Sequence, residues 1–356
     1  NAEVIMKLNL TLAFLLWIIG APPIFAQVEA KLAWLDSVPP SERETRLAEA
    51  AKMESEVVVY ANLDVSGAKA LGDGFMKRYP SVKAHMVHFS GAAIINRVEA
   101  EARAGRPVSD AMLSGQLGVL ALLDRKILAR YKSPQRESYR EGFKDKEGYW
   151  TVGFTNLMVT SYNTRHVKKD EAPRRLEDLL DARWKGKMAM DTQSYGWFGA
   201  VLQLMGEQEG LRFMRRLNDQ NLTHIRGRRS MNELLAAGEF EMAVETNLNS
   251  VLTLSARGAP LWFAPIRPLF LSPSLLYMTQ NAPHPNAGAL FVDYVLSEEG
   301  QRIVLSTNRT PAHPQVKPAE AQLLEGLDIR IADVLAIGKR YGALGKLYRE
   351  IFPGAK

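Results

Sequence analysis

The sequence predicts an α/β protein made of two hinged lobes, each built on a parallel sheet. Strands and helices alternate along most of the chain, and two extended segments are longer than the other strands. The roughly 330 residues that follow an apolar leader suit two domains of about 150 residues each. We therefore expect two α/β lobes joined by long crossover strands.

The leader has the features of a secretory signal peptide. A run without charged residues extends from Leu8 to Gly20, after Lys7, and small residues and prolines end it. A basic start, a short apolar run and a small residue at its end predict a signal peptide at 6–26. The run is shorter than the about 20 residues that cross a bilayer, although an uncleaved anchor is the alternative. We expect a periplasmic protein whose mature chain begins near Gln27.

Composition limits the function further. Hydrophobic residues make up 46% of the chain, and it has no cysteine, which excludes disulfides, zinc–thiolate sites and cysteine nucleophiles. The net charge is +6, but the basic residues are interspersed with acidic ones. This pattern gives a solvated surface with a bias toward anionic ligands rather than a nucleic-acid interface.

In the first part of the chain the alternation is regular. Ser41 is expected to cap the first helix, and Glu44, three residues later, completes a capping box. Short β-branched runs after turn residues predict buried strands, and their spacing predicts parallel βαβ units. We predict helices at 41–53, 67–78, 92–104 and up to 124, and strands at 56–60, 82–88 and 110–113.

The second part contains the long segments. Residues 149–162 and 265–279 are extended, and a helix pair spans 286–305 with its corner at Ser297. Between the long segments we predict helices within 192–205, 207–218 and 230–237, and a strand at 240–245. Lobe one is then discontinuous, with lobe two between its halves and C-terminal helices packed on both. The predicted limits are 50–155 plus 272–325 for lobe one, 156–271 for lobe two and 326–356 for the C-terminal helices.

Seven short segments carry a family resemblance. Two of them are DLLDARWKGKMAM at 178–190 and FVDYVLSEEGQRIV at 291–304; the others lie at 47–60, 75–87, 97–113, 159–164 and 234–244. In this order and spacing they resemble the extracellular solute-binding proteins of bacterial ABC importers, in particular the ferric-iron-binding branch. The resemblance implies a type II periplasmic binding protein fold that holds a small solute between its lobes, changes nothing in it, and delivers it to an inner-membrane ABC permease.

The iron ligands of that branch are not present. Family members bind iron with a histidine, a glutamate and two adjacent tyrosines, a hard-oxygen set that suits a hard cation. The resemblance places the histidine at Asp64, the glutamate at Gly115 and the tyrosines near Leu248 and Asn249. No tyrosine occurs between Tyr195 and Tyr277, so a small register error does not restore the pair. We expect no metal site of the family's kind.

The anion side of that site is better matched. Iron-binding members hold an anion at a helix N-terminus with a serine loop and an asparagine, and these positions fall on Ser194 and near Arg228. Free N–H groups at a helix N-terminus attract anions, and arginine offers a two-pronged donor. We therefore expect Ser194 and the arginine loop at 226–229 to bind an anion.

Further candidates follow the predicted strands, because ligands of open α/β sheets bind beyond the carboxyl ends of the strands. Each also has an ordinary structural interpretation: a helix cap for Ser90, a core aromatic for Tyr195, and a solvated loop for the arginines. The predicted ligand-binding residues are Asn62, Asp64, Ser90, Gly91, Ser114 and Gln116 in lobe one, and Ser194, Tyr195, Arg226, Arg228, Arg229, Glu245 and Asn247 in lobe two.

The interpretation is thus a monomeric periplasmic solute-binding protein that captures a small anion, with no cofactor and no nucleic-acid partner. Neither a nucleophile elbow, a P-loop nor a dinucleotide fingerprint occurs in the sequence, so no enzyme is predicted. Two alternatives stay open: a protein of the same fold that holds ferric iron through an anion or chelator, and a periplasmic sensor that presents its liganded form to a receptor.

Overall fold

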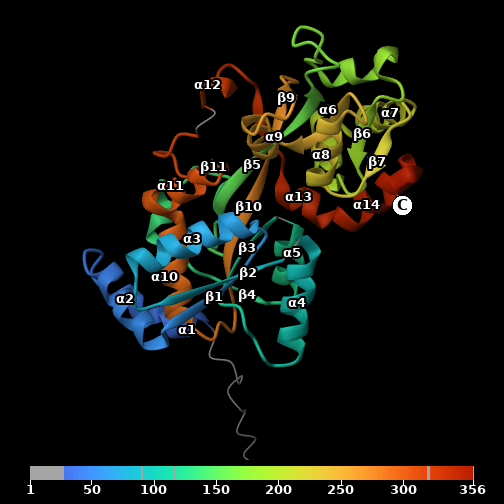
Figure 1. Cartoon of the computed structure of the whole chain (residues 1–356). Helices are drawn as coiled ribbons and strands as arrows, with labels where there is room; N and C mark the ends of the chain where they lie inside the picture. Colours follow the sequence, from blue (N-terminus) through green and yellow to red (C-terminus); the bar gives the residue numbers. More distant parts are fainter. Residues whose placement is uncertain (1–27, 90, 116, 319–320, 356) are drawn as a thin grey trace, which may run out of the picture.

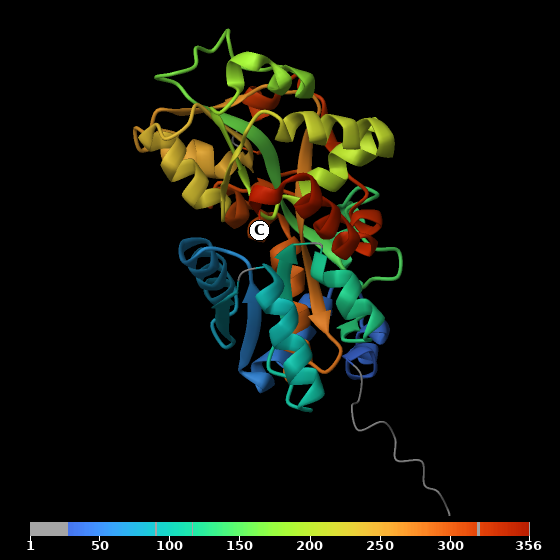
Figure 2. The same ribbon diagram turned by 90° about the vertical axis from the view of Figure 1, so that its right-hand side faces the viewer.

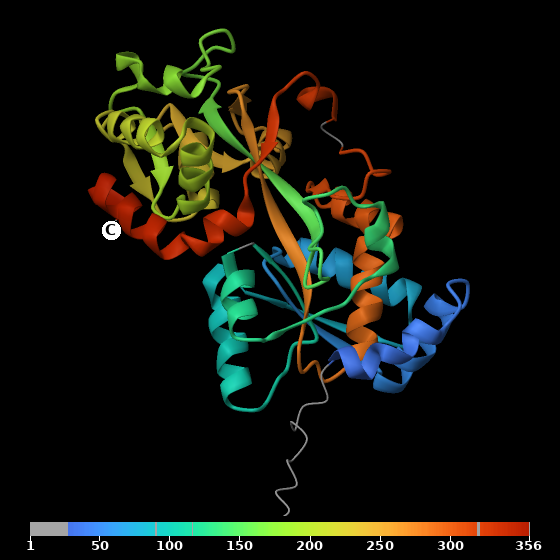
Figure 3. The ribbon, with the colours of Figure 1, turned by 180° about the vertical axis from the view of Figure 1, so that it is seen from behind.

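The computed structural model describes residues 28–89, 91–115, 117–318 and 321–355. The predicted signal peptide at 6–26 lies outside these ranges, as do Ser90 and Gln116. Figures 1 and 3 show two α/β bodies joined by two long strands. The predicted α/β class with two lobes is confirmed, and the exact lobe limits stay a prediction.

The first body contains a parallel sheet in which β1 pairs with β2 on one side and β3 on the other. Helix α10 packs against one face and α4 and α5 lie on the other (Figure 1). Its elements are α1 (Val28–Leu32), α2 (Arg43–Glu54), β1 (Glu56–Ala61), α3 (Val65–Arg78), β2 (Lys83–His88), α4 (Gly91–Arg103), β3 (Ala111–Gly115), α5 (Leu117–Asp124), β4 (Leu128–Ala129), α10 (Pro285–Leu296) and α11 (Glu298–Ser306).

The second body has its own parallel group, in which β6 pairs with β7 and β8. Helices α6 and α7 lie on one face of these strands and α8 and α9 on the other. The elements are β6 (Met188–Asp191), α6 (Tyr195–Met205), α7 (Glu207–Asn218), β7 (Thr223–Ile225), α8 (Arg228–Ala237), β8 (Met242–Asn247), α9 (Leu248–Ala256) and β9 (Leu261–Ala264).

Two long antiparallel strands join the bodies. Strand β5 (Thr151–Asn163) pairs with β10 (Leu269–Thr279) over most of its length. Because β10 also pairs with β3 and β5 with β8, the strand order β2-β1-β3-β10-β5-β8-β6-β7 runs through both bodies. These strands are the two extended segments that the sequence predicted.

The C-terminal part of the chain returns to the second body. Strand β11 (Thr310–Pro311) pairs with β5, and β12 (Ile329–Ile331) pairs with β10. After α12 (Ala321–Leu324) come α13 (Val334–Lys339) and α14 (Tyr341–Ile351). Helix α14 packs on α6 and α7, whereas α13 contacts both α6 and α5. Figure 2 shows these helices at the level between the two bodies.

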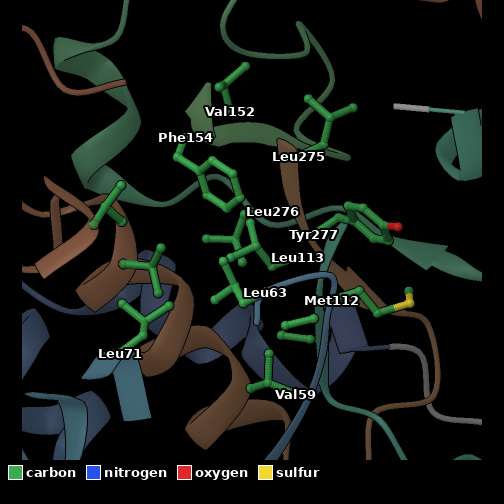
Figure 4. Close-up of a cluster of buried hydrophobic side chains, with 14 of the residues drawn as sticks. Val59, Leu63, Leu71, Met112, Leu113, Val152, Phe154, Leu275, Leu276 and Tyr277 are labelled. Carbon is green, nitrogen blue, oxygen red and sulfur yellow. The ribbon is translucent and has the colours of Figure 1, made fainter. Parts of the chain in front are cut away.

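The core of the first body lies beneath the crossing strands. Figure 4 shows side chains of β1, β3, β5 and β10 converging there, among them Val59, Leu113, Phe154 and Tyr277, all at most 2% exposed. This buried apolar layer continues through β5 toward α8 and α9, and a second cluster fills the space under α6, α7 and α14. Burial of such side chains contributes about 1.5–3 kcal/mol each and fixes the position of the sheet edge.

Two helix starts differ from the prediction. Ser41 does not cap the first predicted helix. Helix α2 begins at Arg43, and its N-cap residue is Glu42, which makes no side-chain hydrogen bond to the helix. Conversely, Asp64 is the N-cap of α3, and its carboxylate accepts from the Gly67 N–H at 2.7 Å. The corner of the last helix pair was predicted correctly: Ser297 caps α11 and accepts from the Gly300 N–H at 3.2 Å.

Ser297→Ala tests that corner. The variant loses the cap of α11, and we expect the free energy of unfolding to fall by about 1 kcal/mol, measured by urea denaturation. Ser306→Ala is the matched control, because its exposed hydroxyl donates only to the Ile303 carbonyl in the last turn. Equal losses for the two variants would contradict the capping role.

Candidate functional site

A buried carboxylate stands at the carboxyl end of the second parallel group. Glu245 of β8 is 0% exposed and has partners from two other loops. The Ser194 hydroxyl donates to its Oε2 at 2.6 Å, and Arg228 Nε donates to Oε1 and Oε2 at 2.8 and 2.9 Å. The structure therefore brings together three of the predicted residues: Glu245 near the end of β8, Ser194 after β6 and Arg228 after β7.

The Arg228 guanidinium is held at its Nε atom, and its terminal nitrogens have no hydrogen-bond partner in the described residues. Its side chain is 32% exposed, against 1% for Glu245, and only Nε is engaged with the carboxylate. The two terminal nitrogens have no hydrogen-bond partner within the part of the chain that the structure describes. Burial acts to lower the pKa of Arg228, but the Glu245 carboxylate outweighs it and the pKa is raised. The guanidinium is thus held charged, with two donor groups unused.

Asp191 positions both loops. Its Oδ1 accepts from the Gln193 N–H at 2.7 Å and its Oδ2 accepts from the Gly227 N–H at 3.0 Å. Gly227 has φ of +94°, a conformation that favours glycine, and it leads directly into α8 and Arg228. Asp191 was not predicted as a site residue. The signal for it is a carboxylate at the end of a strand, because Asp191 is the last residue of β6 and directly follows the 178–190 motif.

The N-terminus of α6 is open on one side. Ser194 is its N-cap, yet the hydroxyl bonds to Glu245 rather than to the first turn. A Cβ added to Gly196, in that first turn, would meet nothing within 4 Å. The first N–H groups of a helix have no partner within it, so this open turn offers donors to a ligand.

Tyr195 is enclosed by the C-terminal helix. It is 8% exposed, and its ring lies 5.3 Å from that of Tyr341 and 5.2 Å from that of Tyr348, centre to centre. Arg349 donates to the Tyr195 hydroxyl at 2.8 Å, and the Tyr348 hydroxyl donates to the Asp191 carbonyl at 2.6 Å. These three residues of α14 could not be found by strand-end reasoning, since they reach the site from more than 140 positions away in sequence.

The remaining lobe-two candidates lie outside this cluster. Arg229 pairs with Glu233 on the exposed surface of α8 and is 83% exposed. Arg226 is exposed in the loop after β7, and Asn247 is the N-cap residue of α9 without a side-chain cap bond. Their roles as ligand contacts stay predictions.

On the lobe-one side, the predicted residues are at the ends of β1 and β3. Asn62 Oδ1 is buried with no hydrogen-bond partner in the described ranges, while the Ser114 hydroxyl bonds to that of Tyr277. Gly91 begins α4. The Asp64 carboxylate is taken up by the α3 cap and by Arg309, 3.6 Å away. Burial would raise the pKa of Asp64, but the Gly67 N–H and Arg309 hold it below its usual value.

The positions that carry iron ligands in the family offer no such set here. Asp64 is engaged as a cap, Gly115 has no side chain, and Leu248 is buried at the start of α9. No group of three or more His, Cys, Asp or Glu side chains suited to a metal ion is found in the described residues. Among those residues, too, no helix has the length and apolarity needed to span a membrane.

A model of the bacterial extracellular solute-binding proteins matches residues 118–331, more than half of the chain. The chain belongs to this family. The predicted resemblance is confirmed, and so is the role of a solute-binding component of an ABC transporter; such proteins work outside the cytoplasm and deliver small ligands to permeases.

Individual relatives are distant in sequence and close in fold. The Fe(3+)-binding periplasmic protein of Serratia marcescens is 21% identical over 272 residues, 73% of this chain and 79% of that protein. Iron-bound HitA of Pseudomonas aeruginosa superimposes with a TM-score of 0.71 at 18% identity, covering 83% of this chain and 99% of its own. AfuA of Actinobacillus pleuropneumoniae, with fructose-6-phosphate bound, gives 0.72 at 19% identity, covering 84% and 98%. At these identities the structures establish the fold alone.

Glu245→Ala tests the buried pair. Removing the carboxylate leaves the Arg228 Nε and the Ser194 hydroxyl without their shared partner, so the free energy of unfolding should fall by about 3–5 kcal/mol, as for other broken buried pairs. Glu233→Ala, the acidic partner of the neighbouring but exposed Arg229, should cost less than about 1 kcal/mol. Urea denaturation of both variants measures the difference, and similar losses would mean that Glu245 does not hold the loops together.

Proposed function

We propose that this solute-binding protein captures a small anion, such as a phosphate ester, a phosphonate or a small carboxylate. The observation that carries the proposal is Arg228: its Nε is fixed by the buried Glu245, and its terminal nitrogens are unused. A guanidinium fork of this kind matches the paired oxygens of carboxylate or phosphate. The anion would lie between that fork and the first turn of α6.

The surroundings of Arg228 support the same class of ligand. Open space stands in front of Gly196 in the first turn of α6, and also at Gly227 and Gly115, so a ligand could approach the backbone closely at these points. Helix α6 adds the partial positive charge of its N-terminus. Because Glu245 is already neutralised by Arg228, it does not repel an anion as a free carboxylate would.

Among the structural neighbours, AfuA contains fructose-6-phosphate and a Trichodesmium protein contains iron and citrate. A phosphate ester and a carboxylate both fit the donor set described here. Two relatives, the Serratia protein and HitA, bind iron, and they favour the alternative of ferric iron or an iron chelate held through its anion. The engaged Asp64 and the missing tyrosines at Leu248 and Asn249 count against direct iron ligation.

We propose further that the chain acts as a monomer, catalyses no reaction, and passes its solute to an inner-membrane ABC permease after export by the 6–26 signal peptide. A sensor role, in which the closed form is presented to a receptor, is the remaining alternative. A permease and ATPase encoded beside this chain would favour import, whereas a neighbouring histidine kinase would favour sensing.

Calorimetric titration of the purified protein tests the ligand class. We expect binding of at least one of inorganic phosphate, fructose 6-phosphate and citrate, and none of ferric chloride when phosphate, citrate and other chelating anions are absent. Visible absorbance on adding iron separates the iron alternative, since a colourless protein holds no ferric–oxygen site of that kind. Binding of neutral sugars or cations only would overturn the proposal.

Arg228→Lys tests the residue. It keeps a positive charge beside Glu245 but loses the planar pair of terminal NH2 groups, so affinity for the anion that binds should fall by about 1.5–3 kcal/mol. Arg229→Lys is the matched control, because that exposed side chain pairs with Glu233 on the helix surface. Thermal unfolding should show that both variants are folded. Unchanged affinity in Arg228→Lys would then mean that Arg228 does not bind the anion.

A further inference from the structure

The C-terminal segment, residues 332–352, lies at the boundary between the two bodies. Figures 1 and 3 show α13 above α5 of the first body and beneath α6 of the second. Contact with α5 is close: a Cβ on Gly338 would stand 2.5 Å from Leu120 Cδ1. On its other side, Ile337 packs on α6, where a Cβ on Gly199 would lie 3.2 Å from Ile337 side-chain carbons. The segment is therefore held between the helices that follow β3 and β6.

Polar contacts attach this segment to the second body. Arg340 donates to both oxygens of Glu207, at 2.9 and 2.7 Å. The Gln203 amide exchanges hydrogen bonds with the backbone of Asp333, at 3.2 and 3.0 Å. The position of α14 over the loops after β6 and β7 is thus fixed from several sides.

Tyr341 begins α14 on the face that packs against the site. That face also carries Leu344, Gly345 and Tyr348, which are buried against the second body. Tyr341 is half-buried, with its ring against Tyr195. The hydroxyls of Tyr195 and Tyr348 are engaged, whereas that of Tyr341 has no hydrogen-bond partner in the described part of the chain.

The charged groups of the site also act on the Tyr341 hydroxyl. Burial raises the pKa of its hydroxyl, Tyr195 adds to the rise, and Arg228 and Asp191 act on it in opposite directions. The phenol therefore stays protonated at neutral pH. On the face of α14 that packs against Tyr195, it is a hydrogen-bond donor with no acceptor among the described residues.

We propose that the C-terminal segment forms a third wall of the solute site and that the Tyr341 hydroxyl donates a hydrogen bond to the anion held by Arg228. The inference rests on the proposed function and extends it to a helix beyond residues 118–331, the range that the family model matches. It also defines the ligand group further: an oxygen that accepts from both a guanidinium and a phenol, as in a phosphate monoester or a carboxylate.

Tyr341→Phe is the test, because it removes the hydroxyl and keeps the ring against Tyr195. The variant is titrated with fructose 6-phosphate, inorganic phosphate and citrate, and it should bind whichever of them the wild type binds about 10-fold more weakly. Tyr149→Phe is the control: Tyr149 is also half-buried with no hydrogen bond found for its hydroxyl in the described ranges, but it lies in the first body beside Arg130. The control should bind with the affinity of the wild type, and both variants should unfold at the same temperature as the wild type.

The outcomes are distinct. A loss confined to Tyr341→Phe supports the third wall. Equal affinities for the wild type and Tyr341→Phe, or the same loss in the control, overturn it and leave the proposed function standing. A wild type that binds neither probe nor citrate overturns the proposed function, and the third wall with it.

Discussion

The second body depends on one buried charge. Glu245 is 0% exposed, and a carboxylate in that position is tolerated only when it is paired and hydrogen-bonded. Its partners are Ser194 from the loop after β6 and Arg228 from the loop after β7. The same contacts that satisfy the charge therefore hold the segments after β6 and β7 to the end of β8. In this way the stability of the sheet edge and the geometry of the candidate site have a common cause.

The two bodies are linked by more than the crossing strands. Strands β5 and β10 give the covalent and hydrogen-bonded connection, and α13 adds a packed contact at a distance from it. Because Ile337 and Arg340 hold this segment to the second body, separating the bodies has to break or slide the contact of Gly338 with Leu120.

The fold could be predicted further than the site, for a physical reason. Hydrophobic periodicity is local, and it located the strands, the long crossings and the corner at Ser297. The family resemblance indicated Ser194 and Arg228, and the strand-end rule for open sheets added Glu245. The sequence could not show that Glu245 accepts a hydrogen bond from the Ser194 hydroxyl, nor that Tyr341 and Arg349 contact Tyr195. Those contacts arise from packing between segments that are distant in the sequence. The predicted Ser41 cap was wrong. Glu44, the second residue of the predicted capping box, instead accepts from Arg78 and the Tyr79 hydroxyl, at 2.8 and 2.9 Å, which are contacts with a distant segment.

The free groups around Arg228 are the physical basis of the proposal that this protein binds an anion rather than bare iron. The carboxylates beside Arg228 already accept hydrogen bonds: Glu245 from Arg228 and Ser194, and both Asp191 oxygens from backbone N–H groups. What remains is a set of donors, namely the Arg228 terminal nitrogens, the first turn of α6 and the Tyr341 hydroxyl. A cation needs acceptor oxygens, and a neutral sugar needs donors and acceptors together. Only a group whose exposed atoms are all acceptors complements such a set, and a deprotonated phosphate or carboxylate is that group.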